Sequence, residues 1–187
     1  MKLRILISAL LSLSITNGWA QTIFVHCYDF GCKSNKSIEF SPIQWRQVSA
    51  LFIPTLSEAD EKQSIRKAVA LMEQFSGELT GTSLDVGGNY PGSSIPNQMD
   101  CIDESTNTFQ YLYAIEKLNL LKWHKVGLKK RRIVWLVSHW TAVIEEISTK
   151  QKFAVDSWYR DNGYMPYIQR LENWQVKKDF IKKYNPY

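Results

Sequence analysis

Residues 133–158, IVWLVSHWTAVIEEISTKQKFAVDSW, decide which fold class the sequence predicts. Residues 133–147 and 152–158 are rich in β-branched and aromatic side chains, and the polar residues 148–151 lie between them. Two such runs joined by a polar segment are typical of a β-hairpin. His139 and Asp156 fall on opposite arms of this hairpin, so the same stretch carries two side chains with acid–base chemistry.

Helical patterns come before the hairpin along the chain. Apolar residues recur at helical spacing over residues 42–53 and 57–75, and again from Asp100 to about residue 118. Asp100 is a good N-cap, and Asp103 occupies the acidic position of a capping box. Helices followed by an antiparallel sheet predict an α+β fold.

The remaining segments of the chain are weaker signals. Residues 77–98 hold five of the nine glycines and indicate a long loop, and loops of that length are often functional. Residues 120–126 predict a short strand. We expect further helical turns over residues 166–174 and 176–184. No internal repeat and no linker divides the sequence, and 187 residues fit one domain.

The N-terminal residues predict export. Lys2 and Arg4 precede the apolar run 5–15, and Gly18 and Ala20 place small residues where a signal peptidase reads. We therefore expect residues 1–20 to be a secretory signal peptide that is cleaved before Gln21. The run is too short for a membrane-spanning helix, which needs roughly 20 apolar residues. A periplasmic or secreted protein without stable membrane insertion is the expectation.

Charge argues against nucleic acid as a partner. Removal of Lys2 and Arg4 with the signal lowers the formal net charge from +5 to +3. The one dense cationic cluster, residues 129–132, directly precedes an apolar run, and we interpret it as a solvated turn. The expected partner is a protein or peptide substrate, and the expected oligomeric state is a monomer.

The three cysteines divide into a pair and a singleton. Cys27 and Cys32 enclose a short loop that contains Gly31, and in an oxidising compartment they most simply form a disulfide. Metal binding by this pair is the alternative, although the sequence offers no second pair of ligands. Cys101 is left over, and an unpaired thiol in an exported protein is a candidate reactive group.

Cys101, His139 and Asp156 form a candidate nucleophile, general base and orienting carboxylate. Cys101 falls in the first turn of a predicted helix, where free N–H groups and the helix dipole favour a thiolate, so we expect a lowered pKa. The same N–H groups are candidates for stabilising an oxyanion. Each residue also has a structural interpretation, because an isolated cysteine or histidine more often belongs to the core.

The hairpin register decides whether His139 meets Asp156. A turn centred on residues 147–148 places the two opposite each other, with Cβ atoms roughly 5 Å apart. A turn centred on residues 149–150 keeps them on one face but separates them by roughly 13 Å along the strands. Polar turn chemistry favours the second register and catalysis the first, so the sequence leaves both open.

Three motifs together resemble the bacterial transglutaminase-like cysteine peptidases. They are Met99-Asp100-Cys101-Ile102-Asp103-Glu104, Ser138-His139-Trp140-Thr141-Ala142-Val143-Ile144 and Phe153-Ala154-Val155-Asp156-Ser157-Trp158, and the resemblance covers about residues 95–160. It implies a papain-like α+β core over about residues 57–160 of a single domain spanning 21–187, with the catalytic helix packed on a small antiparallel sheet. It also implies a Cys101–His139–Asp156 triad that cleaves peptide or amide bonds, or occasionally transfers an acyl group to an amine, with no required cofactor.

The resemblance suggests supporting residues around the triad. Some exported members of the group bind calcium beside the catalytic cysteine, and Asp100, Asp103 and Glu104 occupy comparable positions; helix capping is the alternative role for these acids. Gln98 is the candidate side-chain oxyanion donor. Trp140 and Trp158 flank the hairpin face and are expected to exclude water.

Other residues limit the resemblance. Ile102 and Asp103 stand where cell-wall endopeptidases of the NlpC type carry Ser-Gly after the cysteine, which argues against a murein peptidase. His26 and His124 are alternative bases, but neither has a sequence partner comparable to Asp156, and Lys122 and Lys125 surround His124 with positive charge.

The sequence therefore predicts an exported thiol hydrolase. The alternatives are a non-catalytic periplasmic binding module on the same fold, and a cell-wall amidase or toxin-like effector that shares the chemistry but differs in substrate.

Overall fold

The computed structural model describes residues 22–53, 55–90, 95–134 and 136–176. Within them the fold is mixed α and β, with a two-stranded and a four-stranded antiparallel sheet and four helices. The predicted signal peptide and residues 177–184 of the predicted C-terminal turns lie outside the described residues. The elements in chain order are β1 (Ile23–Tyr28), β2 (Ser34–Glu39), α1 (Pro42–Ala50), α2 (Glu58–Thr80), α3 (Cys101–Lys117), β3 (His124–Val134), β4 (Val137–Glu146), β5 (Lys152–Asp156), β6 (Tyr167–Arg170) and α4 (Leu171–Gln175).

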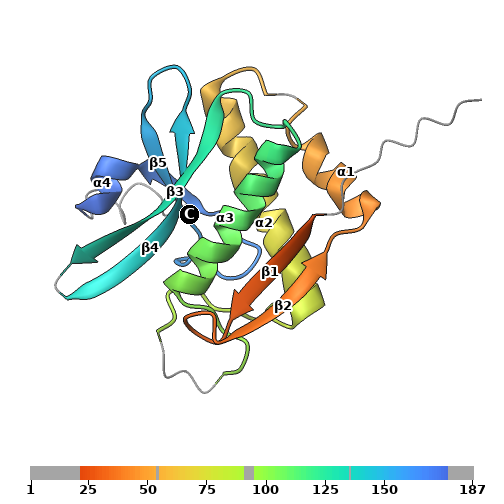
Figure 1. The fold of residues 1–187 in the computed structure, drawn as a ribbon, viewed down its shortest axis with the longest axis vertical. Helices are drawn as coiled ribbons and strands as arrows, with labels where there is room; N and C mark the ends of the chain where they lie inside the picture. Colours follow the sequence, from red (N-terminus) through yellow and green to blue (C-terminus); the bar gives the residue numbers. More distant parts are fainter. Residues whose placement is uncertain (1–21, 54, 91–94, 135, 177–187) are drawn as a thin grey trace, which may run out of the picture.

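Helix α3 lies between the two sheets, as Figure 1 shows, with the β1–β2 ribbon on one side and the β3–β6 sheet on the other. The main core fills the space between α2, α3 and one face of the larger sheet. Ile65, Leu112, Ala142, Ile144 and Val155 are buried there. A smaller cluster lies on the opposite face of the sheet, where α4 covers it; its buried members are Val143, Ala154, Leu171 and Trp174. Because neighbouring residues of β4 alternate between the two clusters, this sheet is buried on both faces.

Local capping explains where the long helices begin. Ser57 caps α2, and Asp100 caps α3 in a capping box with Asp103, which confirms the sequence prediction. Helix α2 extends beyond the predicted end at residue 75 and is capped by Gly81. Gly81 has a φ of 88°, which glycine adopts more readily than other residues. The predicted long loop is therefore shorter than expected at its N-terminal end.

The predicted hairpin exists, but the predicted extent of its first strand was wrong. Residues 133–147 do not form one strand: β3 ends at Val134 and β4 begins at Val137, so the apolar run turns back on itself. Leu136 takes a φ of 68° at this turn. The interpretation of residues 129–132 as a turn was also wrong, because they lie within β3, beside a register shift between Gly127 and Lys130.

Three strands, β1, β2 and β6, were not predicted from the sequence, and the helical turns expected from residue 166 were wrong for residues 167–170. Strands β1 and β2 pair in an antiparallel ribbon, and Cys27 and Cys32 form a disulfide at the end of that ribbon, as the spacing indicated. Residues 167–170 form β6 at the sheet edge, and only residues 171–175 are helical. None of the described helices is long and apolar enough to cross a bilayer.

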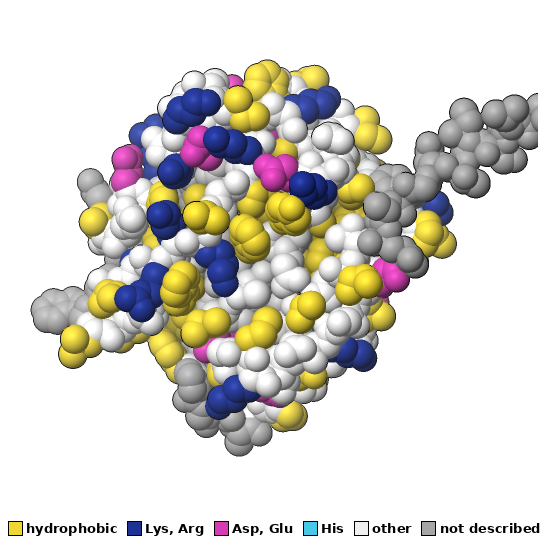
Figure 2. Space-filling view, in the orientation of Figure 1, with side chains coloured by type: hydrophobic (Ala, Val, Ile, Leu, Met, Phe, Trp, Pro, Cys, Tyr) yellow, Lys and Arg dark blue, Asp and Glu magenta, His cyan; other side chains and the backbone are white. Residues whose placement is uncertain are grey.

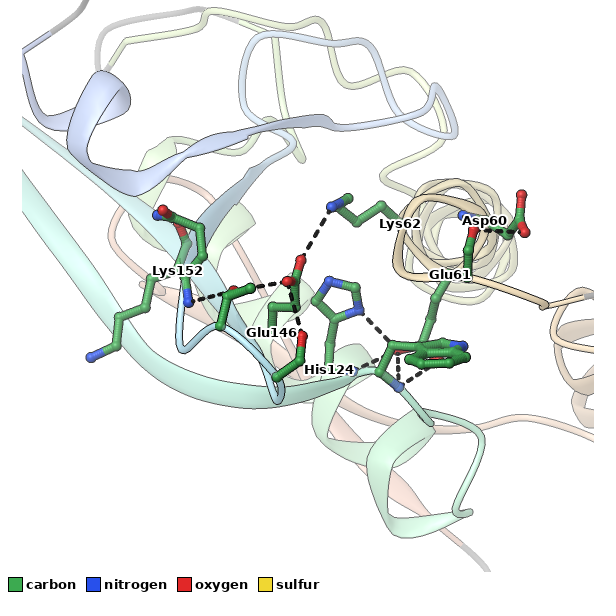
Figure 3. A network of polar contacts seen from close by, with 11 residues as sticks. Asp60, Glu61, Lys62, His124, Glu146 and Lys152 are labelled. Carbon is green, nitrogen blue, oxygen red and sulfur yellow. Dashed lines mark hydrogen bonds and ion pairs between the residues drawn. The ribbon is translucent and has the colours of Figure 1, made fainter.

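A buried glutamate joins α2 to the start of the larger sheet. The Glu61 carboxylate accepts hydrogen bonds from the backbone N–H groups of Lys122, Trp123 and His124 and contacts the His124 Nδ1 at 2.9 Å (Figure 3). Burial raises the pKa of Glu61, but the bonds from His124 and the backbone outweigh burial and leave the pKa below its usual range. The ionised carboxylate thus accepts hydrogen bonds from backbone N–H groups that would otherwise be buried without an acceptor.

We expect Glu61→Ala to lower the free energy of unfolding by about 3–5 kcal/mol, because it leaves buried donors and the His124 ring without their acceptor. Urea unfolding at neutral pH measures this. The matched control is Glu78→Ala on the exposed side of the same helix, which should change stability by no more than about 0.5 kcal/mol. Equal effects of the two substitutions would contradict the structural role of Glu61.

Candidate functional site

Cys101 is the first residue of α3 and lies against the backbone of β4. Its Sγ is 4.0 Å from the Ser138 carbonyl oxygen, and it accepts from the backbone N–H of Trp140. The β4–β5 ladder ends at Ala142↔Val155, so these two backbone groups lie beyond its end. The partly exposed sulfur therefore contacts the backbone on both sides of His139.

His139 and Asp156 meet through a register that lies between the two considered from the sequence. In the observed register Ala142 lies opposite Val155. His139 therefore lies two residues along β4 from the position opposite Asp156, and the two side chains are on the same face of the sheet. The side chains bridge this diagonal, and His139 Nε2 is 2.7 Å from Asp156 Oδ2. Asp156 therefore contacts Nε2 of the His139 ring, and Nδ1 is the ring nitrogen that remains for another partner.

Trp174 is a third member of this buried group, and no pattern in the sequence pointed to it. Its indole Nε1–H donates to Asp156 Oδ2 at 2.7 Å, the same oxygen that contacts His139. Arg132 packs on the indole at 4.5 Å, and its guanidinium donates to the Trp174 carbonyl oxygen. The carboxylate is thus oriented by two donors, and the indole itself is fixed by a cation.

Aromatic rings cover His139 on the α4 side of the sheet. The rings of Trp158, Tyr159 and Trp174 have centroids 4.9, 5.1 and 5.6 Å from the imidazole. Trp158 thus occupies the shielding position that was expected of it. Trp140 follows His139 in β4 and points to the opposite face, where Lys129 and Arg131 lie 5.7 and 5.9 Å from its ring, so it does not cover the imidazole.

The expectation of a lowered cysteine pKa was wrong. Burial raises the pKa of the Cys101 thiol, and the carboxylates of Asp100 and Asp156 raise it further. The N–H groups of Trp140 and of Cys101 itself act in the opposite direction but do not outweigh these effects. Cys101 therefore rests as a thiol at neutral pH, and its ionisation depends on a base.

The first turn of α3 offers fewer free donors than the sequence suggested. Asp100 Oδ1 accepts from the N–H groups of Ile102 and Asp103, at 2.9 and 3.1 Å. Asp100 does not bind the N–H of Cys101, so this group is the first-turn donor that remains beside the sulfur. Of the first-turn donors expected to stabilise an oxyanion, the Asp100 cap thus leaves the Cys101 amide.

Gln98 anchors a loop. Its Nε2 donates to the Leu84 carbonyl oxygen at 3.0 Å, and its Oε1 accepts from the Val86 N–H at 3.1 Å and from the Asn89 side chain. Gln98 is also buried, with 1% of its surface exposed. These contacts argue against the oxyanion role expected of Gln98.

The disulfide loop holds the start of α3. The two oxygens of Asp103 accept from the N–H groups of Phe30, at 2.9 Å, and Cys32, at 2.5 Å. Asn107 one turn later bonds both the N–H and the carbonyl oxygen of Cys27, at 2.8 and 2.9 Å. The Cys27–Cys32 loop therefore fixes the helix end on which Cys101 lies.

The acids considered for calcium have other contacts in the described residues. Asp100 Oδ1 and both oxygens of Asp103 accept from backbone N–H groups, and Glu104 is buried near Glu73 and Asp85. Among the described residues, the one group of three metal-ligating side chains whose donor atoms converge is Cys27, Cys32 and Asp103, and its two sulfurs are joined in the disulfide. Calcium prefers six to eight oxygen ligands, so this arrangement does not fit it.

Glu104 belongs instead to a buried group of carboxyls beneath the site. Burial raises the pKa of Glu73 to about 8 and that of Asp85 to about 7, and burial with repulsion from Glu73 raises the pKa of Glu104 well above its usual range. Glu73 Oε1 and Glu104 Oε2 are buried with no hydrogen-bond partner in the described part of the chain. The sequence predicted neither Glu73 nor Asp85 as part of the site.

The other two histidines lie in structural positions. His26 is buried, contacts the hydroxyls of Tyr111 and Thr82 at 3.2 and 3.3 Å, and has its pKa lowered to about 4 by burial. His124 is held by Glu61. The Cys101 sulfur contacts the backbone groups that flank His139, so His139 is the base candidate that the geometry favours.

In comparisons with known proteins, no family model, curated protein or solved structure matches the chain.

We expect stability to fall as the pH rises from about 6.5 to about 8. The pKa of Glu73 is about 8 in the folded chain, whereas in the unfolded chain it has the ordinary value of 4.5. Unfolding therefore releases a proton in this range, and Glu73→Gln should reduce the decline in unfolding free energy by roughly 1–2 kcal/mol. Urea unfolding at several pH values measures the slope. Glu78→Gln is the exposed control, and an unchanged slope in Glu73→Gln would rule out the assignment.

We also expect Trp174→Phe to slow alkylation of Cys101 about tenfold at neutral pH, because Asp156 loses one of the two donors that orient it. The pH profile of alkylation should shift to higher pH, because a larger share of the reaction then depends on the unassisted thiol, whose pKa burial raises. Trp45→Phe, another buried indole in the main core, controls for lost packing. If both variants lose stability but neither changes the pH profile, Trp174 is only a core residue.

Proposed function

We propose that this protein is a thiol hydrolase that cleaves a peptide or amide bond, with Cys101 as nucleophile, His139 as general base and Asp156 as the orienting carboxylate. One observation carries the proposal. The His139 ring is held by Asp156 at 2.7 Å while the Cys101 sulfur lies against the Ser138 and Trp140 backbone groups that flank His139. A nucleophile, a base and a group that orients the base are the parts that nucleophilic catalysis needs.

Proton transfer in this proposal starts from a neutral thiol. Asp156 accepts from the Nε2–H of His139, which favours the tautomer with an unprotonated Nδ1. Nδ1 takes the proton of Cys101 as the sulfur attacks the carbonyl carbon, and the imidazolium that forms is stabilised by the Asp156 carboxylate. The raised pKa of Cys101 supports this coupled route over a preformed ion pair.

The rest of the cycle returns the proton. The Cys101 N–H stabilises the oxyanion of the tetrahedral intermediate, and His139 then donates its Nδ1 proton to the leaving amine. Water attacks the thioester while His139 accepts its proton. The carbon–sulfur bond then breaks, His139 returns the proton to the Cys101 sulfur, and the acid product leaves. If an amine attacks in place of water, the same steps transfer the acyl group.

The papain-like class that the sequence motifs imply remains part of this proposal. In this chain Cys101 begins a helix that packs on an antiparallel sheet, and His139 and Asp156 lie on neighbouring strands. The disulfide supports an oxidising compartment, as the predicted signal peptide does. An exported hydrolase acting on a protein or peptide substrate is the consistent proposal.

Alkylation by iodoacetamide tests the triad without a known substrate. Cys101 is the free cysteine of the chain, so its labelling can be followed by intact mass. We expect selective labelling at neutral pH and a decrease of about 10- to 100-fold in rate for His139→Ala, because general-base assistance is lost. Cys101→Ser should also abolish the appearance of new termini when the protein is incubated with a peptide library.

His26→Gln is the matched control, with thermal unfolding confirming that each variant is folded. It should label at a rate close to that of the parent chain. Equal labelling of the parent and His139→Ala, or no labelling of either, would favour a non-catalytic binding module on the same fold.

A further inference from the structure

The distal end of the β3–β4 ribbon exposes apolar side chains. Figure 1 shows this end of the ribbon projecting away from the rest of the fold. Ile133, Leu136 and Val137 are 60%, 99% and 51% exposed. Leu136 also takes a φ of 68°, which a glycine or asparagine would adopt more readily. A fully exposed leucine at such a turn does not serve the core.

Basic residues lie near this end of the ribbon. Between Glu116 and Glu145 the chain carries seven Lys or Arg residues and no Asp or Glu. Lys130 and Arg131 are exposed in β3, within three residues of Ile133. Figure 2 shows hydrophobic and basic side chains side by side on the projecting part of the molecule. We define Lys130, Arg131, Ile133, Leu136 and Val137 as the ribbon tip.

We propose that the ribbon tip docks on an anionic lipid surface. Ile133, Leu136 and Val137 enter the boundary between headgroups and acyl chains, and Lys130 and Arg131 bind lipid phosphates. Two features favour lipid over a protein partner. The apolar residues lie on a protrusion, which inserts into an interface but offers a partner chain no groove, and the adjacent cations complement anionic headgroups.

Docking of this kind is peripheral and reversible. Three aliphatic side chains bury far less apolar area than a spanning helix does, so binding should need both the apolar insertion and the attraction of the cations. It should therefore weaken with salt, because the electrostatic part is screened.

The ribbon tip is continuous with the candidate site. Val137 precedes Ser138, whose carbonyl oxygen lies 4.0 Å from the Cys101 sulfur. If the proposed hydrolase function holds, docking brings Cys101 to bonds in membrane-proximal chains. The docking itself does not depend on that function, and Cys101→Ala should bind lipid as the parent does.

Co-sedimentation with vesicles tests the docking. The chain used is residues 21–187, which contains every described element and omits the apolar run 5–15 that would bind lipid by itself. We expect binding to vesicles of phosphatidylglycerol and phosphatidylcholine, and much weaker binding to phosphatidylcholine alone. Leu136→Asp should lower the partition coefficient at least about tenfold, and its side chain tolerates the backbone of the turn.

Charge and position are tested separately. The pair Lys130→Gln and Arg131→Gln should lower binding about 25-fold, at about a fivefold loss per cation. The control for the apolar change is Leu56→Asp, at a leucine that is 82% exposed elsewhere. The control for charge is the pair Arg46→Gln and Lys67→Gln, at exposed positions of α1 and α2. Both controls should bind as the parent does.

Three results would overturn the proposal. The first is no binding to anionic vesicles, and the second is equal loss of binding in the ribbon-tip and control variants. The third is a dimer of the parent chain that Leu136→Asp dissociates while vesicles remain unbound, which would make the tip a contact between copies of this chain.

Discussion

The end of the β4–β5 ladder is the constraint on which the rest of the site depends. Pairing stops at Ala142↔Val155, so the backbone of β4 beyond that point is not covered by β5. The Cys101 sulfur contacts the Ser138 and Trp140 groups there. A longer ladder would occupy this edge, and α3 could not bring its first residue to it. The same register sets the diagonal that brings His139 to Asp156.

Local and distant contacts contribute differently to this arrangement. Asp100 and Asp103 fix the start of α3 through the capping box, which is a contact between near neighbours. The disulfide loop then holds Asp103 from more than seventy residues away, through the N–H groups of Phe30 and Cys32. On the opposite side of the sheet, Trp174 and Arg132 hold Asp156 in the same indirect way. Cys101 and Asp156 are thus each positioned by a segment distant in sequence.

This division explains what the sequence could predict. The N-cap of α3 and the Cys27–Cys32 disulfide depend on residue types at short spacing, so both were predictable. The break between β3 and β4 was missed because residues 133–137 are apolar and carry no turn signal. Trp174 was missed because no spacing links an indole to a carboxylate on another element.

The pKa of Cys101 shows the same limit. From the sequence, the helix end was the influence on the thiol that the prediction used, and it favours the thiolate. In the fold, burial and the carboxylates of Asp100 and Asp156 outweigh it. Two of these three influences come from tertiary structure, since Asp156 lies on another element and burial requires the whole core.

The buried carboxyls Glu73, Asp85 and Glu104 add to the negative charge near the start of α3. If all three were ionised, their charges would oppose both a thiolate and an oxyanion at Cys101. At neutral pH the raised pKa values keep protons on Glu73 and Glu104, whereas Asp85, with a pKa of about 7, is about half protonated. In the proposed mechanism the thiol, whose own pKa is raised, therefore needs His139 to accept its proton during attack. The acids around Cys101 thus favour general-base assistance over a preformed thiolate in that proposal.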